Sequence, residues 1–452
     1  MNSEQRKRID PIIKTSILIL FSTFFFLDYL SDVFGLIPRH FTWLPEVISI
    51  GFLIYIFWRL FEGKKLVPIL NQTRWVLLFM AFTLFGIIIN GVDLPVAAAG
   101  IRNNLKYLPL FFLPFFFKLD RAFIKKFLCF LFVLALVQLP VTIIQRIVYK
   151  TPSGDPVGGT LGAHSTGILS VFLTLCIAFW TANFIKTPLK PGLYILGFTG
   201  LIAPLGLSET KVSFFLLPVV FVCIFLFSTE KKKLLGKTLM VFICFVLGVF
   251  FTAKLHNYLY VEKSPDKTIL KKPKTEKKEK VKEKHSKIPI EKYANPKLVF
   301  NLSYKRQTIR SGILNRIPQV LFAFDQIQKD PVHLLFGVGA GNASDSFFEP
   351  AQGKYYQKYG KLDIGNNLLS RLLWEYGLIG TLLFFFIFLF FFVKIWKLRK
   401  LDRIIGVTAF GFLVLIVIYS ITSIYFNTML INLFGYLFWF LGGYLIVGRN
   451  DI

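Results

Sequence analysis

Cysteine and acidic residues are scarce in this sequence. Only four of the 452 residues are cysteines, and each lies within an apolar run. Thiols placed in this way predict neither a disulfide framework nor a zinc site. Aspartate and glutamate number 25 against 53 lysines and arginines. The acidic candidates show no metal-ligand spacing and no nucleophile signature, so we expect a function that needs no metal and no other cofactor.

Apolar residues, by contrast, make up 54% of the chain, and 53 residues are phenylalanine. This composition, with a mean hydropathy of +0.60, excludes an ordinary water-soluble core and is typical of a helical bundle in lipid. A net charge of +28 would suggest nucleic acid in a soluble protein. Here most of the basic excess lies in short loops and in one Lys-rich stretch. Anionic lipid head groups of a membrane explain it better, and we expect no nucleic-acid partner.

About twelve apolar runs are long enough to be transmembrane helices. They predict an all-α integral membrane protein, a polytopic bundle of about twelve transmembrane helices with one large extracytoplasmic loop between helices nine and ten. The first residues are basic and carry no small-residue cleavage site, so the first run is expected to be a retained helix. The predicted spans are residues 16–36, 45–61, 75–91, 98–117, 124–146, 165–185, 192–208, 212–228, 237–257, 371–393, 404–424 and 427–447.

The distribution of basic residues predicts the topology. Lysine and arginine cluster in every second short loop, and the intervening loops carry few of them. By the positive-inside rule, the basic loops and both termini are cytoplasmic. We therefore expect a multi-pass protein of the cytoplasmic membrane in three segments. These are residues 1–257 with helices one to nine, residues 258–370 as a periplasmic or extracellular loop, and residues 371–452 with the last three helices.

The long loop divides into two parts by composition. Residues 258–300 are rich in Lys and Glu and poor in aromatic side chains, so we expect a solvated tether there. Residues 301–370 are expected to be structured. Apolar side chains recur at helical spacing beside Arg310 and Arg316, which predicts an amphipathic helix at the outer membrane surface. Pro318 predicts a kink or a break in that helix.

A glycine-rich run follows the amphipathic segment. Gly337, Gly339 and Gly341 alternate with small residues and predict a tight turn. Such a turn lets backbone approach backbone or a ligand closely. A nucleotide-binding interpretation would need a preceding strand, and the sequence predicts none.

Basic residues near the outward ends of the spans are candidates for binding an anion. A guanidinium offers a planar fork of donors to phosphate oxygens, so the group suits a diphosphate on a lipid carrier. Any one of them could instead extend to lipid head groups or cap a helix. Glu209 stands close enough to one of them, Lys211, to form a simple ion pair. The candidates are Arg102, Lys211, Arg316 and Arg371.

Three further residues are weaker candidates. His164 follows a Gly-rich loop and could exchange protons near neutral pH, although a surface or interhelical hydrogen bond is the commoner role. Arg310 belongs to the amphipathic run. Glu375 lies inside the tenth predicted helix, where we expect a structural hydrogen bond rather than a catalytic base.

The region from Arg316 to Phe385 resembles the signature block of the O-antigen ligase and O-antigen polymerase superfamily of bacterial polysaccharide assembly. Members have an Arg, an amphipathic stretch that ends in a Pro, a Gly-rich turn, and then a polar pair that opens a helix with spaced Leu, Glu and Gly. Ligases usually have a His at the first position of that pair, and this sequence has Asn366. The matching positions are Arg316, Pro331, Gly337–Gly341, Asn366, Asn367, Leu369, Leu373, Glu375, Gly377 and Gly380.

The resemblance implies glycosyl transfer at the outer face of the cytoplasmic membrane. The implied donor is an oligosaccharide on undecaprenyl diphosphate, and the acceptor is a second lipid-linked saccharide or lipid A core. Arg316, Lys211, Arg102 and Arg371 would hold the diphosphate and stabilise its charge. Asn366 and Asn367 would orient the acceptor hydroxyl. An amide cannot take up a proton as imidazole does, which favours a polymerase, or a ligase with another base.

Two other classes stay open. A transporter or flippase of lipid-linked saccharide would also be a many-helix bundle with intramembrane cations, but the sequence has no halves that repeat one hydropathy pattern. A non-catalytic partner in a polysaccharide-export complex is the third alternative.

Overall fold

The computed structural model describes residues 3–62, 67–149, 157–162, 165–208, 211–227, 235–256, 258, 316–346, 348–401, 403–424 and 432–448. All regular secondary structure within these residues is helical, so the prediction of an all-helical chain is confirmed for them. Eight of their helices are long and apolar enough to cross a membrane. The Lys-rich tether lies outside the described residues.

The described residues as far as His256 supply ten α-helices. They are α1 (Ser3–Asp28), α2 (Leu44–Phe61), α3 (Val67–Ile89), α4 (Leu94–Leu105), α5 (Leu108–Phe116), α6 (Arg121–Tyr149), α7 (Thr166–Lys186), α8 (Pro191–Leu207), α9 (Lys211–Phe227) and α10 (Leu235–His256). The later part supplies α13 (Arg316–Ile327), α14 (Pro331–Phe336), α15 (Lys354–Tyr359), α16 (Leu368–Trp396), α17 (Arg403–Thr422) and α18 (Asn432–Gly448).

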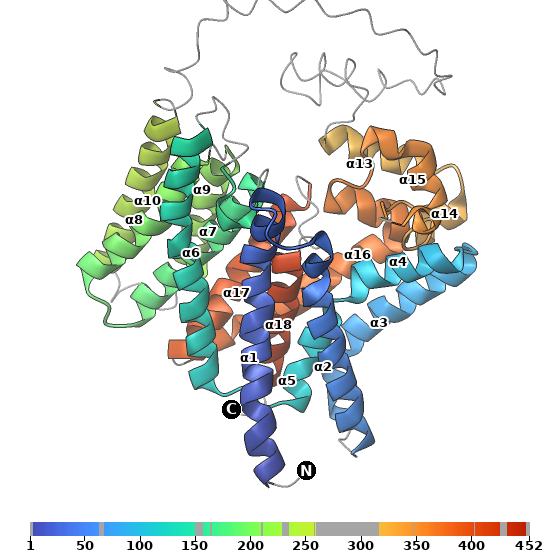
Figure 1. Cartoon of the computed structure of the whole chain (residues 1–452), viewed down its shortest axis with the longest axis horizontal. Helices are drawn as coiled ribbons and strands as arrows, with labels where there is room; N and C mark the ends of the chain where they lie inside the picture. Colours follow the sequence, from blue (N-terminus) through green and yellow to red (C-terminus); the bar gives the residue numbers. More distant parts are fainter. Residues whose placement is uncertain are drawn as a thin grey trace, which may run out of the picture.

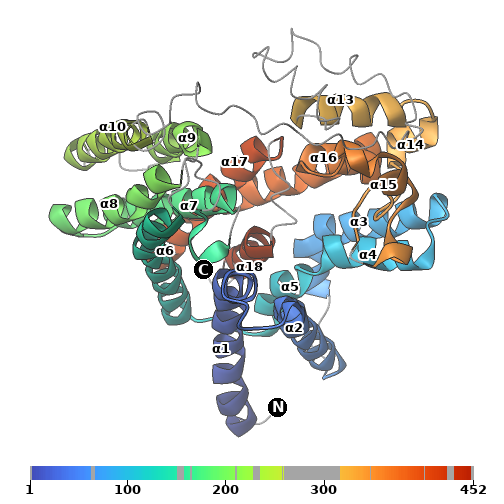
Figure 2. The ribbon, with the colours of Figure 1, turned by 45° about the horizontal axis from the view of Figure 1, so that its top comes forward.

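The helices α17 and α18 lie in the middle of the bundle, between two flanks (Figure 1). On one flank α7 packs against α17 and α8, and α8 packs against α6 and α10. On the other flank α16 packs against α3, and α5 packs against α18 and α2. The short helices α13 and α14 pack on α16, at the opposite end of the molecule from the start of α1 (Figure 2).

Aromatic side chains fill the centre where α5, α16, α17 and α18 meet. The ring of Phe391 lies 5.9 Å from that of Phe412, 5.4 Å from that of Phe438 and 6.1 Å from that of Trp439. All three pairs meet edge to face, a geometry that adds specific attraction to the burial of apolar surface. These contacts join α16, α17 and α18, and the ring of Phe111 in α5 joins the same core at 5.9 Å from that of Phe391.

The fourth predicted span is not one continuous helix. It consists of α4 and α5, separated by Lys106 and Tyr107. Pro109 has no N–H to continue the hydrogen-bonded ladder, and it stands in the first turn of α5 instead. The carbonyl of Lys106 accepts a hydrogen bond from the Ser49 hydroxyl at 2.7 Å. A side chain of α2 thus satisfies a backbone group at the break.

Two basic residues donate hydrogen bonds to carbonyls at the C-terminal ends of α7 and α9. The ammonium group of Lys237 donates to the carbonyls of Phe184 and Thr187, each at 2.8 Å. The guanidinium of Arg399 donates to the carbonyl of Phe227 at 3.0 Å. A cation near carbonyls at a helix C-terminus also complements the helix dipole. Part of the basic excess therefore has a structural role.

The segment before α16 forms a small helical unit, defined here as residues 316–346 and 348–367 and called the α13–α15 unit. Its apolar core contains Phe322, Ile327 and Tyr359, packed against Trp374 of α16. The described part of α13 begins at Arg316, and Pro318 is buried within it. The predicted kink is not observed within α13.

Candidate functional site

The glycine-rich turn joins the α13–α15 unit to α16 by direct backbone contact. Gly337 has φ of +71° and Gly377 of +62°, and Gly377 interrupts the helical conformation of α16. A Cβ on Gly337 would lie 2.4 Å from the carbonyl carbon of Glu375, and a Cβ on Gly377 would lie 2.5 Å from the nitrogen of Gly337. Only glycine fits both positions.

The same turn also contacts α4. A Cβ on Gly341 would lie 2.3 Å from the carbonyl oxygen of Val96, and a Cβ on Gly100 would lie 2.4 Å from that of Ala340. The amide of Val338 donates to the carbonyl of Trp374 at 2.7 Å. The close approach that the glycines permit is therefore between backbones, and it fixes α4 against α16.

Glu375 lies where these three elements meet, and only 1% of its surface is exposed. One carboxylate oxygen accepts a hydrogen bond from the Ser344 hydroxyl of the turn. The other accepts a hydrogen bond from the Asn104 amide of α4 at 3.4 Å and lies 3.4 Å from Nε of Arg371. The contacts of Glu375 are those of a structural hydrogen bonder that also faces a cation.

Arg371 lies one helical turn before Glu375 and is 5% exposed. Its Nε and Nη2 atoms have no hydrogen-bond acceptor among the described residues, and the same holds for the hydroxyl of Tyr107 and the indole N–H of Trp439. Buried polar groups in folded proteins are nearly always hydrogen-bonded, and a buried charge is costly without a partner. Unpaired donors from three helical segments therefore converge on one place.

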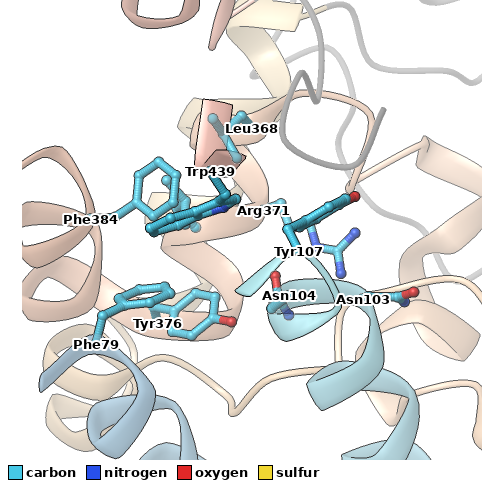
Figure 3. Close-up of a pocket in the computed structure, with 10 residues that line it drawn as sticks. Phe79, Asn103, Asn104, Tyr107, Leu368, Arg371, Tyr376, Phe384 and Trp439 are labelled. Carbon is cyan, nitrogen blue, oxygen red and sulfur yellow. The ribbon is translucent and has the colours of Figure 1, made fainter. Parts of the chain in front are cut away.

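These donors line a narrow cavity of about 20 Å³, here called the Arg371 cavity. Figure 3 shows Arg371 and Tyr107 above Asn103 and Asn104. A space of this size holds about one water molecule. Its lining residues are Phe79, Asn103, Asn104, Tyr107, Leu368, Arg371, Leu372, Tyr376, Phe384 and Trp439.

Arg102 points to the other side of α4 and has a partner. Its Nε and Nη2 atoms donate to the two carboxylate oxygens of Glu46 on α2, at 2.6 and 2.8 Å. The ammonium of Lys106 donates to the same carboxylate at 3.2 Å. This bidentate arrangement is the strong form of an Arg–carboxylate contact. The partner expected for a charge within an apolar stretch is therefore Glu46.

A second, wider cavity of about 280 Å³ lies on this side of α4 and is called the Arg102 cavity. Arg102 and Lys106 line it, whereas Asn103, Asn104 and Tyr107 line the Arg371 cavity. The last turn of α4 thus forms the wall between the two. The lining residues of the wider cavity are Thr23, Phe24, Leu27, Asp28, Thr42, Trp43, Pro45, Glu46, Arg102, Lys106 and Asn432.

The predicted catalytic residues lie at the start of α16. Asn367 is the N-cap: its side-chain oxygen accepts from the amide of Ser370 at 2.7 Å. Its NH₂ group donates to the Arg316 carbonyl at 3.0 Å and to the Gln319 side chain at 2.8 Å. Asn366 is exposed and donates to Asp363 at 2.6 Å. Asn366, Asn367 and Arg316 line neither of the two cavities.

The other predicted positions are dispersed. Lys211 is the first residue of α9, which packs mainly against α7, α10 and α17, and Lys211 lines neither of the two cavities. His164 and Arg310 lie outside the described residues. Of the four predicted anion-binding residues, the structure brings Arg371 and Arg102 to opposite sides of α4.

Sequence reasoning missed Tyr107, Trp439 and Glu46. Tyr107 and Trp439 lie in apolar runs of a chain that is 17% aromatic, so nothing in the sequence distinguishes them. Glu46 is different, because a carboxylate in the first turn of an apolar span is costly in lipid and usually has a partner. That signal could have paired it with a nearby cation.

These features define a class, namely an all-helical, multi-pass membrane protein with a buried arginine cavity beneath a small helical unit. No family model matches the sequence, and no curated protein matches it either. The function must therefore be argued from the residues of the two cavities.

Proposed function

We propose that the protein is a membrane glycosyltransferase that acts on undecaprenyl-diphosphate-linked oligosaccharide, polymerising repeat units or ligating them to an acceptor. The observation that carries the proposal is Arg371, a buried guanidinium with donor atoms that lack acceptors in the described structure, beside the unpaired donors of Tyr107 and Trp439. Glu375 supplies one negative charge 3.4 Å from Nε of Arg371, and a diphosphate would supply the hydrogen-bond acceptors that the Nε and Nη2 atoms lack.

The chemistry needs no group beyond those of the chain and its substrates. The acceptor hydroxyl attacks the anomeric carbon, a new C–O bond forms, and the bond from that carbon to the diphosphate breaks. The hydroxyl proton passes to the departing diphosphate. Arg371, Tyr107 and Trp439 would stabilise the charge that develops on this leaving group, and fixed donors of this kind lower a barrier strongly.

The Arg371 cavity must widen to admit a diphosphate, since it now has room for about one water molecule. The break between α4 and α5 adjoins the cavity at Tyr107. Backbone at a helix end lacks the full set of helical hydrogen bonds and moves more easily than a helix interior. We infer that substrate entry displaces Tyr107 at this break.

The distribution of basic residues supports a topology with both termini in the cytoplasm and the α13–α15 unit at the outer face of the cytoplasmic membrane. The start of α1 and the α13–α15 unit lie at opposite ends of the molecule, as this topology requires (Figure 1). An accessibility label on Lys354, an exposed residue of the unit, should react from outside intact cells, and reaction only after lysis would exclude this topology.

Asn366 favours a polymerase within this proposal. Its amide donates to Asp363 and cannot act as a proton acceptor in the way of an imidazole. Purified protein with lipid-linked oligosaccharide alone should therefore give a ladder of repeats. Transfer only after lipid A core is added would identify a ligase instead.

The direct test of the proposal is Arg371→Met in cells that make the polysaccharide. Membrane expression should persist, chain extension should stop, and lipid-linked single repeats should accumulate on the outer face. The matched control is Arg74→Met on α3, which removes an exposed arginine that lines neither cavity. Unchanged polymer in the Arg371 variant would contradict the enzyme, and repeats trapped on the inner face would favour a transporter.

A further inference from the structure

The Arg102 cavity takes no part in the proposed glycosyl-transfer step. We propose that it binds an uncharged saccharide ring of the lipid-linked substrate, while the diphosphate binds on the other side of α4. The inference rests on the proposed function and adds a second subsite to it. A sugar and a diphosphate would then be held apart by one helical turn.

The charges that line the Arg102 cavity are balanced. Two carboxylates, Asp28 and Glu46, face two cations, Arg102 and Lys106. Glu46 already binds both cations through hydrogen bonds. An anionic ligand would have to displace that carboxylate, which is held in a bidentate contact, and would then meet it as a like charge. A neutral ligand meets no such opposition.

The cavity offers both donors and acceptors to a polyhydroxyl molecule. The side-chain oxygen of Asn432, at the start of α18, is shielded from solvent and has no donor within the described part of the chain. It lines the cavity together with Thr23 and Thr42. The Thr23 hydroxyl donates to the Leu20 carbonyl at 2.6 Å, so its oxygen can still accept, and the hydroxyls of a sugar can donate to it and to the Asn432 amide oxygen.

An aromatic face completes the site. Trp43 lines the cavity and is 54% exposed, and the guanidinium of Arg102 lies 5.7 Å from the centre of its ring. The apolar C–H face of a sugar ring can cover such a surface while its hydroxyls reach the polar groups around it. Flat aromatic surface beside paired donors and acceptors suits a pyranose better than a compact anion.

The size of the cavity agrees with this ligand. Its volume of about 280 Å³ far exceeds that of the Arg371 cavity, and it is many times the space that a single water molecule needs. The two cavities adjoin the last turn of α4, where Arg102 lines one and Asn103 and Asn104 line the other. A saccharide in one and a diphosphate in the other would therefore contact adjacent side chains.

The test uses the full chain in lipid nanodiscs with soluble probes. Glucose, galactose and N-acetylglucosamine report on the Arg102 cavity by saturation-transfer NMR, and inorganic pyrophosphate reports on the Arg371 cavity by calorimetry. Wild-type protein should bind at least one of the sugars. Asn432→Leu should weaken that sugar about tenfold, the effect of one buried hydrogen bond, and leave pyrophosphate affinity unchanged.

Trp43→Leu should weaken the sugar by a similar factor, and Trp43→Phe should restore most of the binding because a ring is present again. This pair separates loss of the aromatic face from loss of folding. Arg371→Met is the reciprocal control, since it should weaken pyrophosphate and spare the sugar.

The saccharide subsite is wrong if none of the three sugars binds, if both Asn432→Leu and Trp43→Leu leave sugar binding intact, or if those variants weaken pyrophosphate instead. Failure of the proposed function has a different signature. It would appear as unchanged pyrophosphate affinity in Arg371→Met, whatever the sugars do.

Discussion

The two sides of α4 carry arginines that look alike in the sequence and differ in the structure. Arg102 is half exposed, and its Nε and Nη2 atoms both donate to the carboxylate of Glu46. Arg371 is buried, and two of its nitrogen atoms have no acceptor among the described residues. The difference lies in the carboxylate: Glu46 of α2 accepts two hydrogen bonds from Arg102, whereas Glu375 lies 3.4 Å from a single nitrogen of Arg371. Availability of a cation for a ligand is thus set by residues that are distant in sequence.

The largest expected effect comes from removing the available arginine. Arg371→Met should lower the turnover of purified protein with lipid-linked oligosaccharide by about 10²–10³, the loss typical of one fixed donor to a developing charge. Arg102→Met should lower it far less, because the charge of Arg102 is already neutralised by Glu46. Equal losses in the two variants would remove the distinction between the two sides.

The next effect concerns the backbone contact that fixes α4 against α16. Gly337→Ala should destabilise the protein by more than about 3 kcal/mol, since left-handed strain of about 1–3 kcal/mol adds to a clash with the backbone of Glu375. Gly35→Ala is the matched control, because Gly35 has φ of +62° and open space around it. It should cost only about 1–2 kcal/mol of strain.

Thermal unfolding in nanodiscs measures both glycine variants. If Gly35→Ala lowers the unfolding midpoint as much as Gly337→Ala, the contact between the turn and α16 contributes nothing beyond strain.

Glu46→Gln should turn the Arg102 cavity into an anion-binding site, as is proposed for the Arg371 cavity. One carboxylate then faces two cations, so the lining of the Arg102 cavity becomes net positive. The cost in stability should be about 1–3 kcal/mol, because hydrogen bonds to a charged group are lost. Pyrophosphate should bind the Glu46→Gln/Arg371→Met double variant and not the Arg371→Met single variant, as measured by calorimetry. Equal binding by the two would disprove the role of Glu46.

The smallest effect on stability is expected at an exposed ion pair, Lys14 with Asp120, which serves as a reference for the pairs on the two sides of α4. Lys14 lies 2.9 Å from Asp120, which is 53% exposed. The hydrogen bond from Lys14 lowers the pKa of Asp120. The stability it contributes is present above the carboxyl's unfolded pKa and is lost as the pH falls through its folded pKa.

Asp120→Asn should therefore change stability by less than about 1 kcal/mol at neutral pH, as exposed pairs do. Thermal unfolding of wild type and variant at neutral and acidic pH measures it, and the difference between the two proteins should shrink in acid. A difference that grows as the pH falls would contradict the pairing.

Hydropathy predicted most of the helices because the membrane imposes its rule on each segment separately. Every predicted span coincides in large part with helices of the described chain, and the tenth is interrupted at Gly377 within α16. The fourth is divided into α4 and α5. There the apolar run continued past Lys106, but Pro109 and a hydrogen bond from Ser49 of another helix ended α4. The proposed function also rests on the resemblance to the ligase and polymerase block, which no family model and no curated protein match supports independently.

The candidate site was predicted only in part. The position of Arg371 at the outward end of a span predicts an anion-binding residue, and the structure places Arg371 in a cavity. Asn367 is predicted from the resemblance to the ligase and polymerase block, and its amide is fully used as the N-cap of α16. The sequence alone could not show that Arg371 would line a cavity whereas Asn367 would cap a helix. Each outcome depends on contacts with α13, α4 or α18.

Composition and the order of apolar runs determined that the chain is helical and built for a membrane, because each helix satisfies its own backbone and each span meets the same solvent. The spacing of glycines determined that backbone would come close to backbone or ligand near residue 340. Only the tertiary structure decided which arginine has its donors taken by a carboxylate and which keeps donor atoms without an acceptor among the described residues. Pairing of charges is a contact between helices, and no local pattern along the chain encodes it.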